Sequence, residues 1–113
     1  LHIPATAETK GSINYALLSK MPKGGLLVNT ARKEVINEAE LIQFMQERQD
    51  FRYVTDIMPA ADQKMTELFE SRYFATPKKM GAQTAEANIN AGIAAAKQIV
   101  DFFQNGNTRF QVN

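Results

Sequence analysis

Residues 25–32 read GLLVNTAR and decide the fold that this chain is expected to adopt. Residues 26–28 form a continuous apolar run that ends in the polar Asn29 and Thr30. Such a run is typical of a strand that is covered on both faces in a parallel sheet. Arg32 follows this strand directly, and ligands of open parallel sheets bind just outside the carboxyl ends of the strands.

The segments on either side alternate between strand and helix patterns. Residues 1–3 are apolar and are stopped by Pro4, which cannot donate to a ladder. The last helix is the longest, and Asn105-Gly106 closes it as a C-terminal cap would. Alternating elements predict an α/β fold with a parallel sheet layered with helices. The pattern predicts strands at residues 1–3, 26–30, 51–55 and 73–77, and helical segments at 13–18, 37–45, 65–69 and 84–103.

The composition excludes several classes of site. The chain has 113 residues, 44% of them hydrophobic, which is enough for one small domain or part of one. There is no cysteine, so disulfides and thiolate metal sites are impossible, and His2 alone cannot build a zinc site. With 13 basic and 12 acidic residues, no strong field points to nucleic acid or an anionic membrane. No apolar run is long enough for a membrane span.

Four predicted strand ends are the places where a ligand would bind. They are Ile3-Pro4, the stretch 30–32, Asp56, and Pro77-Lys78. Because parallel strands end at the same edge of a sheet, these four ends could make one site for a small molecule. There is no Gly-x-Gly-x-x-Gly run, so the usual phosphate-binding turn of a dinucleotide site is missing from this chain.

Each candidate side chain also has an ordinary structural interpretation. Arg32 could grip a substrate carboxylate through two parallel hydrogen bonds, or it could pair with Glu34 or Glu38 on the surface. Asp56 could accept a hydrogen bond from a cofactor, or it could cap a turn. The pattern of residues alone does not choose between these alternatives.

The basic pair after Pro77 is open to the same two interpretations. A lysine in a closed site can act as a general base, whereas a lysine pair in a loop is usually solvated. Gly81 could let the backbone approach a ligand or simply permit a turn. His2 could face a cofactor or lie satisfied in the interior, and Met58, Met65 and Met80 are expected to be packing residues.

Four segments together resemble the D-2-hydroxyacid dehydrogenase family. They are Leu1-His2-Ile3-Pro4 followed by Thr9-Lys10-Gly11, the GLLVNTAR stretch, Val54-Thr55-Asp56, and TPKKMGA at 76–82. Their order and spacing match along nearly the whole chain. Within the family, TPKKMGAQT is most similar to the short phosphoglycerate dehydrogenases that have lysine in place of the usual histidine.

The resemblance implies a fold and a domain organisation. The fold is a Rossmann-like, three-layer parallel sheet, and this chain is the second half of the nucleotide-binding domain, with the glycine-rich turn upstream. Residues 1–84 then complete the NAD-binding domain. Residues 85–113 form the long helix that crosses toward the substrate-binding domain and the tail that follows it.

The resemblance also implies roles for single residues. Arg32 binds the substrate carboxylate and Lys78 takes the hydroxyl proton, so these two residues are the catalytic pair. No metal is expected. The residues implied to line the NAD site are His2, Pro4, Thr30, Ala31, Arg32, Asp56, Lys78 and Gly81.

The chain departs from the family pattern at two of the three usual catalytic positions. Lys78 stands where the histidine normally follows Thr-Pro, and Ala61 stands where a glutamate is normal, with Asp62 adjacent. A carboxylate beside a histidine helps the imidazole hold a proton, but beside a lysine it would keep the amine charged. We therefore hypothesise that Ala61 compensates for Lys78, with Arg32 and Lys79 as positive neighbours that favour the neutral amine.

The activity implied is NAD-dependent oxidation of a D-2-hydroxyacid, most simply 3-phosphoglycerate to 3-phosphohydroxypyruvate in serine biosynthesis. Two alternatives stay open: reduction of glyoxylate or hydroxypyruvate, and an NAD-sensing binding protein without turnover. The choice between NAD and NADP depends on a residue upstream of Leu1, and NAD is taken from the resemblance. A homodimer of the full-length protein is expected on the same ground, and the absence of cysteine is typical of a cytoplasmic enzyme.

Overall fold

The computed structural model describes residues 1–81 and 84–112. The chain divides into two compact units, Leu1–Met80 and Gly81–Asn113, which are described separately below. The predicted division at residue 84 between a nucleotide-binding part and a crossover part concerns the role of each segment, and it stays a prediction.

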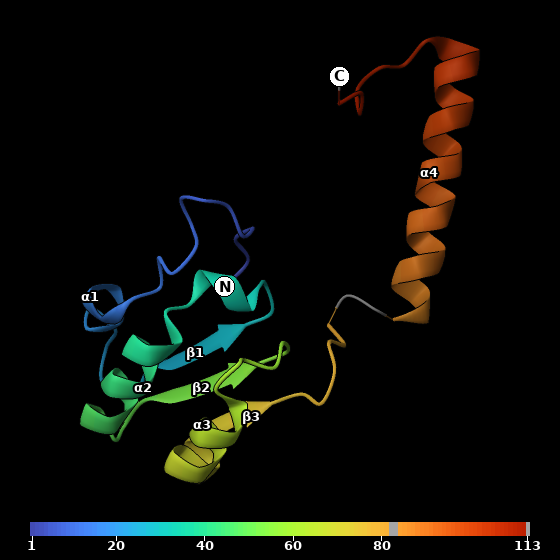
Figure 1. The fold of residues 1–113 in the computed structure, drawn as a ribbon. Helices are drawn as coiled ribbons and strands as arrows, with labels where there is room; N and C mark the ends of the chain where they lie inside the picture. Colours follow the sequence, from blue (N-terminus) through green and yellow to red (C-terminus); the bar gives the residue numbers. More distant parts are fainter. Residues whose placement is uncertain (82–83, 113) are drawn as a thin grey trace. The chain divides into compact units, whose positions relative to one another are not determined.

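The first unit is built on a sheet of three parallel strands. They are β1 (Leu26–Asn29), β2 (Arg52–Thr55) and β3 (Tyr73–Ala75), in the spatial order β1-β2-β3. Figure 1 shows them side by side as arrows that point the same way. The predicted α/β class with a parallel sheet is therefore confirmed, and all three strands end at the same edge.

The helices of this unit begin where the sequence supplies caps. The side chain of Asn37 accepts a hydrogen bond from the backbone N–H of Glu40, and so it caps the predicted amphipathic helix. That helix buries Leu41, Ile42 and Phe44 at helical spacing. The helical segments are α1 (Tyr15–Leu18), the 3₁₀ turn Lys33–Val35, α2 (Glu38–Glu47), α3 (Asp62–Phe69) and the 3₁₀ turn Glu70–Arg72.

One apolar core joins the helices to one face of the sheet. Leu27, Tyr53 and Tyr73 point into this core from successive strands. The other face of the sheet exposes Leu26 at 50% and Phe74 at 59%. The expectation that the first strand is covered on both faces is therefore not met within this unit, because its helices cover one face only. The core residues are Ile13, Leu18, Leu27, Val35, Ile36, Leu41, Ile42, Phe44, Met45, Phe51, Tyr53, Met65, Phe69 and Tyr73.

Three local predictions need correction. Residues 1–3 form no strand, because their one backbone hydrogen bond to β1 runs from the N of Leu1 to the carbonyl of Val28 at 2.6 Å. The helical segment expected at 65–69 begins three residues earlier, as part of the eight-residue helix α3, whose Met65 is fully buried. Met58 and Met80 are exposed and are not packing residues.

The second unit contains one long helix, α4 (Ala85–Asn105). The side chain of Thr84 accepts from the N–H of Ala87 and caps its start. Gly106 ends it with φ of 66°, a left-handed conformation that favours glycine, as the sequence predicted. Among the described residues, no helix combines the length and the apolar character that crossing a membrane requires.

Candidate functional site

The end of β1 is shaped by a buried amide, that of Asn29. Its side chain has no exposed surface, and its Oδ1 accepts a hydrogen bond from the N–H of Ala31 at 3.0 Å. Its Nδ2 donates to the carbonyl oxygen of Arg32, also at 3.0 Å. Because a buried amide must satisfy its donors and acceptors, this pair of bonds fixes the turn that presents Arg32.

A hollow of about 300 Å³ lies beside this turn. Thr30 and His2 line it from the two sides, with Thr30 Oγ1 3.5 Å from His2 Nδ1 and 3.4 Å from the carbonyl oxygen of Leu1. The volume is at the lower end of the range for small-molecule sites, which suits part of a dinucleotide rather than all of it. The hollow brings together five of the predicted site residues, and its lining is His2, Ile3, Pro4, Thr30, Ala31 and Arg32.

Arg32 is exposed and lines this hollow. Its Nη1 donates to the carbonyl oxygen of Ala31 at 2.9 Å. Within residues 1–81 and 84–112, Arg32 forms no ion pair. The alternative that Arg32 pairs with Glu34 or Glu38 on the surface is therefore not what the structure shows. A cation without a carboxylate partner at a strand end is suited to bind an anionic group of a ligand.

Asp56 follows β2, the central strand, and is 8% exposed. Its backbone N–H donates to the carbonyl oxygen of Asn29 at 2.9 Å, which continues the sheet contact past the strand ends. Its carboxylate accepts hydrogen bonds from Thr76 Oγ1 at 2.8 Å and from the N–H of Met80 at 3.0 Å. Asp56 thus caps the loop that follows β3, which is one of its two predicted roles. Its other predicted role, a contact with a cofactor, stays a prediction.

Lys78 is exposed in the loop after β3 and does not line the hollow of Arg32. The strands that lead to Arg32 and Lys78 are separated by β2 alone. Since adjacent strands are about 4.8 Å apart, the two loops start roughly 10 Å from each other at one edge. Gly81 belongs to the second unit, and its predicted role at the cofactor stays a prediction.

Ala61 stands at the position of the missing family glutamate, and its backbone is bonded to another carboxylate, that of Glu38. Glu38, in the first turn of α2, accepts hydrogen bonds from the N–H groups of Ala60 and Ala61 at 3.0 and 2.9 Å. These bonds satisfy the start of α3, where Ala61 supplies no side-chain cap. The adjacent Asp62 accepts a hydrogen bond from the hydroxyl of Tyr73 at 2.6 Å.

This arrangement has an electrostatic consequence for the core. Burial and, second, the hydrogen bond to Asp62 raise the pKa of Tyr73 above its usual value, so its hydroxyl stays a donor. Neither Glu38 nor Asp62 was singled out from the sequence as a structural carboxylate. An acidic residue in the first turn of a predicted helix was the signal that could have indicated Glu38.

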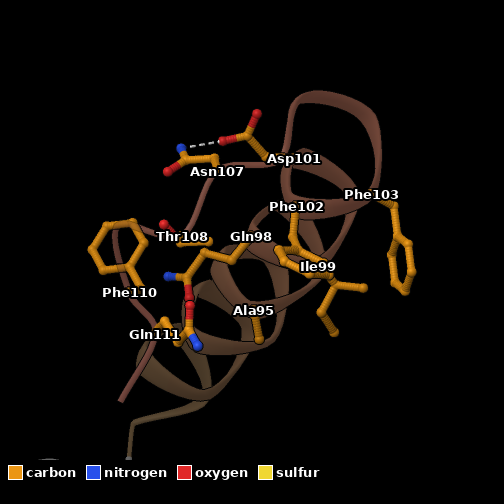
Figure 2. A pocket seen from close by; sticks show the side chains of 10 residues that line it. All are labelled: Ala95, Gln98, Ile99, Asp101, Phe102, Phe103, Asn107, Thr108, Phe110 and Gln111. Atoms are coloured by element: carbon orange, nitrogen blue, oxygen red, sulfur yellow. Dashed lines mark hydrogen bonds between the residues drawn. The ribbon is translucent and has the colours of Figure 1, made fainter. Parts of the chain in front are cut away.

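The second unit contains a larger hollow, of about 550 Å³. Figure 2 shows Phe110 of the tail on the opposite side of it from Ile99 and Phe102 of α4. The one charged side chain in its lining is Asp101, which accepts hydrogen bonds from Asn105 and Asn107. None of the residues predicted for the site lines this hollow. Its surface is mostly apolar, and its one carboxylate is already hydrogen-bonded to two asparagines, so its described lining offers no group for proton transfer.

Comparison with known proteins identifies relatives along the whole chain. Residues 1–77 match the family model described as D-isomer specific 2-hydroxyacid dehydrogenase, NAD binding domain. A D-3-phosphoglycerate dehydrogenase of Haemophilus influenzae is 30% identical over 100% of this chain. A hydroxypyruvate reductase of Thermotoga maritima is 30% identical over 88% of it.

Solved structures agree with this result. The NAD⁺-bound 3-phosphoglycerate dehydrogenase of Entamoeba histolytica is 56% identical over 100% of this chain, with a TM-score of 0.84. The chain spans 37% of the Entamoeba protein, 29% of the Haemophilus protein and 33% of the Thermotoga protein. It therefore corresponds to about a third of such an enzyme.

Proposed function

The chain belongs to the D-2-hydroxyacid dehydrogenase family, whose NAD-binding domain its residues 1–77 match, and we propose that the whole protein oxidises a D-2-hydroxyacid with NAD. The substrate proposed is 3-phosphoglycerate and the product 3-phosphohydroxypyruvate, the first step of serine biosynthesis. The observation that carries the proposal is the placement of Arg32, without an ion-pair partner in the described chain, in a hollow at the same sheet edge that leads to Lys78. The 56% identity to a phosphoglycerate dehydrogenase supports the choice of substrate.

Arg32 and Lys78 have different roles toward the substrate: the first binds it and the second accepts a proton from it. The planar guanidinium of Arg32 binds the carboxylate through two parallel hydrogen bonds and so orients the neighbouring carbon. The amine of Lys78 accepts the proton of the hydroxyl as the carbon–oxygen bond becomes a carbonyl. When bound, NAD supplies the acceptor at C4 of its nicotinamide for the hydride that leaves the same carbon.

The residues around the hollow suit the nicotinamide end of NAD. Thr30 offers a hydroxyl, Ala31 and Pro4 offer small or apolar surface, and His2 offers a ring nitrogen. We propose that these residues, with Asp56, Lys78 and Gly81, surround the nicotinamide and its ribose. The phosphate-binding turn is not within these 113 residues, so the adenine half of NAD is proposed to bind to the rest of the protein.

The test is a turnover assay on the full-length protein. With 3-phosphoglycerate and NAD, the absorbance of NADH should rise, and Lys78→Ala should abolish the rise. Lys64→Ala, which removes an exposed lysine from α3, is the matched control and should behave as the wild type. NAD binding without turnover of any 2-hydroxyacid would favour the sensing protein, and full activity of Lys78→Ala would reject Lys78 as the base.

A second candidate is reduction of hydroxypyruvate or glyoxylate at the same site. The similarity to a hydroxypyruvate reductase of Thermotoga maritima favours it. These substrates have the same carboxylate beside the reacting carbon but no phosphate. The ratio of kcat/KM for 3-phosphohydroxypyruvate to that for hydroxypyruvate, both measured with NADH, distinguishes the two functions.

For the whole protein we also propose a cytoplasmic homodimer that acts on small molecules and not on nucleic acid or membranes. The near balance of charge supports a small-molecule role, and the family resemblance supports the dimer. Sedimentation of the full-length protein tests the oligomeric state, and a monomer at assay concentrations would contradict it.

A further inference from the structure

One carboxylate ties down both ends of the loop that contains Lys78. Thr76 Oγ1 donates to Asp56 Oδ1 at 2.8 Å. The N–H of Met80 donates to both oxygens of the same carboxylate at 3.0 Å. Pro77, Lys78 and Lys79 lie between these two contacts, so Asp56 is bonded to the loop on both sides of the proposed base.

The loop has few other restraints. The N–H of Thr76 donates to the carbonyl oxygen of Thr55 at 3.0 Å, which extends the pairing of β3 by one residue. Across residues 1–81 and 84–112, the structure gives residues 77–79 no hydrogen bond of their own. Pro77 cannot donate one, and Lys78 is exposed. The geometry of the turn around Lys78 therefore depends on what holds residues 76 and 80.

Asp56 itself is held at the end of the central strand. It follows the central strand, it is 8% exposed, and its N–H bonds to the carbonyl oxygen of Asn29. A buried carboxylate needs hydrogen bonds to offset its loss of water, and bonds to a charged acceptor are about twice as strong as neutral ones. The contacts to Thr76 and Met80 therefore restrain both ends of the loop.

We propose that Asp56 is a positioning residue, which holds the 76–80 loop so that the amine of Lys78 is directed at the substrate. The inference rests on the proposed function, since it takes Lys78 to be the base. This role is additional to the proposed place of Asp56 beside the nicotinamide, and it rests on the contacts of both carboxylate oxygens with the loop. Loosening the loop should slow the chemical step and leave the affinity for the cofactor unchanged.

The first test uses Thr76, which reaches Asp56 through its side chain alone. Thr76→Val in the full-length protein removes the hydroxyl donor and keeps the backbone bond to Thr55, and Thr76→Ser keeps the hydroxyl. Thr66→Val is the matched control, because among the described residues the Thr66 hydroxyl donates to the Asp62 carbonyl alone, on the exposed side of α3. The readouts are kcat for 3-phosphoglycerate and the Kd of NADH, measured by fluorescence titration.

We expect Thr76→Val to lower kcat about 10-fold to 100-fold, since a misplacement of about 1 Å costs that much. The Kd of NADH should stay within about two-fold, the range expected of a site whose contacts are unchanged. Thr76→Ser and Thr66→Val should match the wild type. An unchanged kcat in Thr76→Val, or a Kd that weakens as much as kcat falls, would overturn the proposal.

The second test does not depend on turnover. Hydrogen–deuterium exchange compares the N–H of Met80 with that of Asp56 in the wild type and in Asp56→Ala. The Met80 amide should exchange at least about 10-fold faster in the variant, because its acceptor is gone, while the amide at position 56 keeps its bond to Asn29. Equal exchange of the Met80 amide in both proteins would show that Asp56 does not hold the loop, whatever the activity. If Lys78→Ala is fully active but the Met80 amide exchanges faster in Asp56→Ala, Lys78 is not the base, and Asp56 still holds the loop.

Discussion

Asn29 and Arg32 are joined by a hydrogen bond from the Nδ2 of Asn29 to the carbonyl oxygen of Arg32, at 3.0 Å. Asn29 is wholly buried at the end of β1, so it cannot touch a ligand itself. It nevertheless determines where the backbone of Arg32 lies. The packing of the strand and the position of the guanidinium are therefore coupled through one amide.

Replacing this amide should cost stability and activity together. Asn29→Asp keeps the acceptor for the Ala31 N–H but sets a carboxylate oxygen against the Arg32 carbonyl. We expect a loss of about 1–3 kcal/mol in the free energy of unfolding. Urea denaturation measures it. Asn14→Asp is the matched control, because the Asn14 side chain only accepts a bond, from the Leu17 N–H. Equal stability of Asn29→Asp and the wild type would contradict the role given to this amide.

The geometry of Arg32 should matter as well as its charge. Arg32→Lys keeps the charge but loses the planar pair of donors that matches a carboxylate. We expect kcat/KM for the hydroxyacid to fall about 100-fold, equivalent to about 2.7 kcal/mol. Arg52→Lys, an exposed change on β2, serves as the control in the same steady-state assay. A fall of less than about three-fold would mean that Arg32 does not grip the carboxylate bidentately.

Removing the proposed base should affect kcat far more than binding. Lys78→Ala is expected to lower kcat about 10²-fold to 10⁴-fold, the usual contribution of a general base. The Kd of NADH should change little. Stopped-flow measurement of a single turnover separates the chemical step from product release. A normal rate of hydride transfer in this variant would remove Lys78 from the mechanism.

Restoring the family carboxylate should shift the pH dependence. Ala61→Glu restores the carboxylate that is usual in the family, and a negative charge beside an amine favours the protonated form of that amine. The pH profile of kcat/KM should therefore move toward higher pH. Ala60→Glu, at the exposed neighbouring position, is the control, since Glu38 binds the backbone N–H of both residues. Identical profiles for the wild type and Ala61→Glu would contradict the hypothesis of compensation.

The exposed pair Arg48 and Asp50 predicts how stability depends on acid. Hydrogen bonds from Arg48, and then from the N–H of Gly24, hold the pKa of Asp50 well below its usual value. A depressed folded-state pKa adds stability above the unfolded value, about pH 4, and that stability is lost as the pH falls further. The stability difference between wild type and Asp50→Asn should be constant from pH 7 to about pH 5 and shrink below about pH 4. Urea midpoints across this range measure it, and a difference that grows in acid would have the wrong sign.

Much of the fold could be predicted because local patterns and tertiary structure agree. The apolar run that becomes β1, the cap at Asn37 and the cap at Gly106 each depend on neighbours within a few residues. Residues 1–3 were predicted as a strand from hydrophobicity alone. A strand also needs a ladder of hydrogen bonds, and this segment has one such bond to β1.

The site could be predicted only in part. The residues that directly follow the strands were identified, because strand ends are visible as polar residues after apolar runs. The side chains that hold them were missed: Asn29 was read as the end of a strand, and Glu38 as a helix start or a partner of Arg32. The partners of Glu38 lie 22 and 23 positions away in the chain, and such contacts leave no local pattern. Those of Asn29 lie two and three positions away, so its tendency to form a turn with its own backbone was a signal that could have indicated it.

The most direct test of the central claim is a crystal structure of the full-length protein with NAD and a bound 2-hydroxyacid or 2-oxoacid. We predict that both Nη atoms of Arg32 lie about 3 Å from the carboxylate oxygens of the ligand. The Nζ of Lys78 should lie at a similar distance from the oxygen on the neighbouring carbon. A ligand that binds away from the hollow of Arg32, or a Lys78 amine turned toward bulk solvent in that complex, would contradict the account.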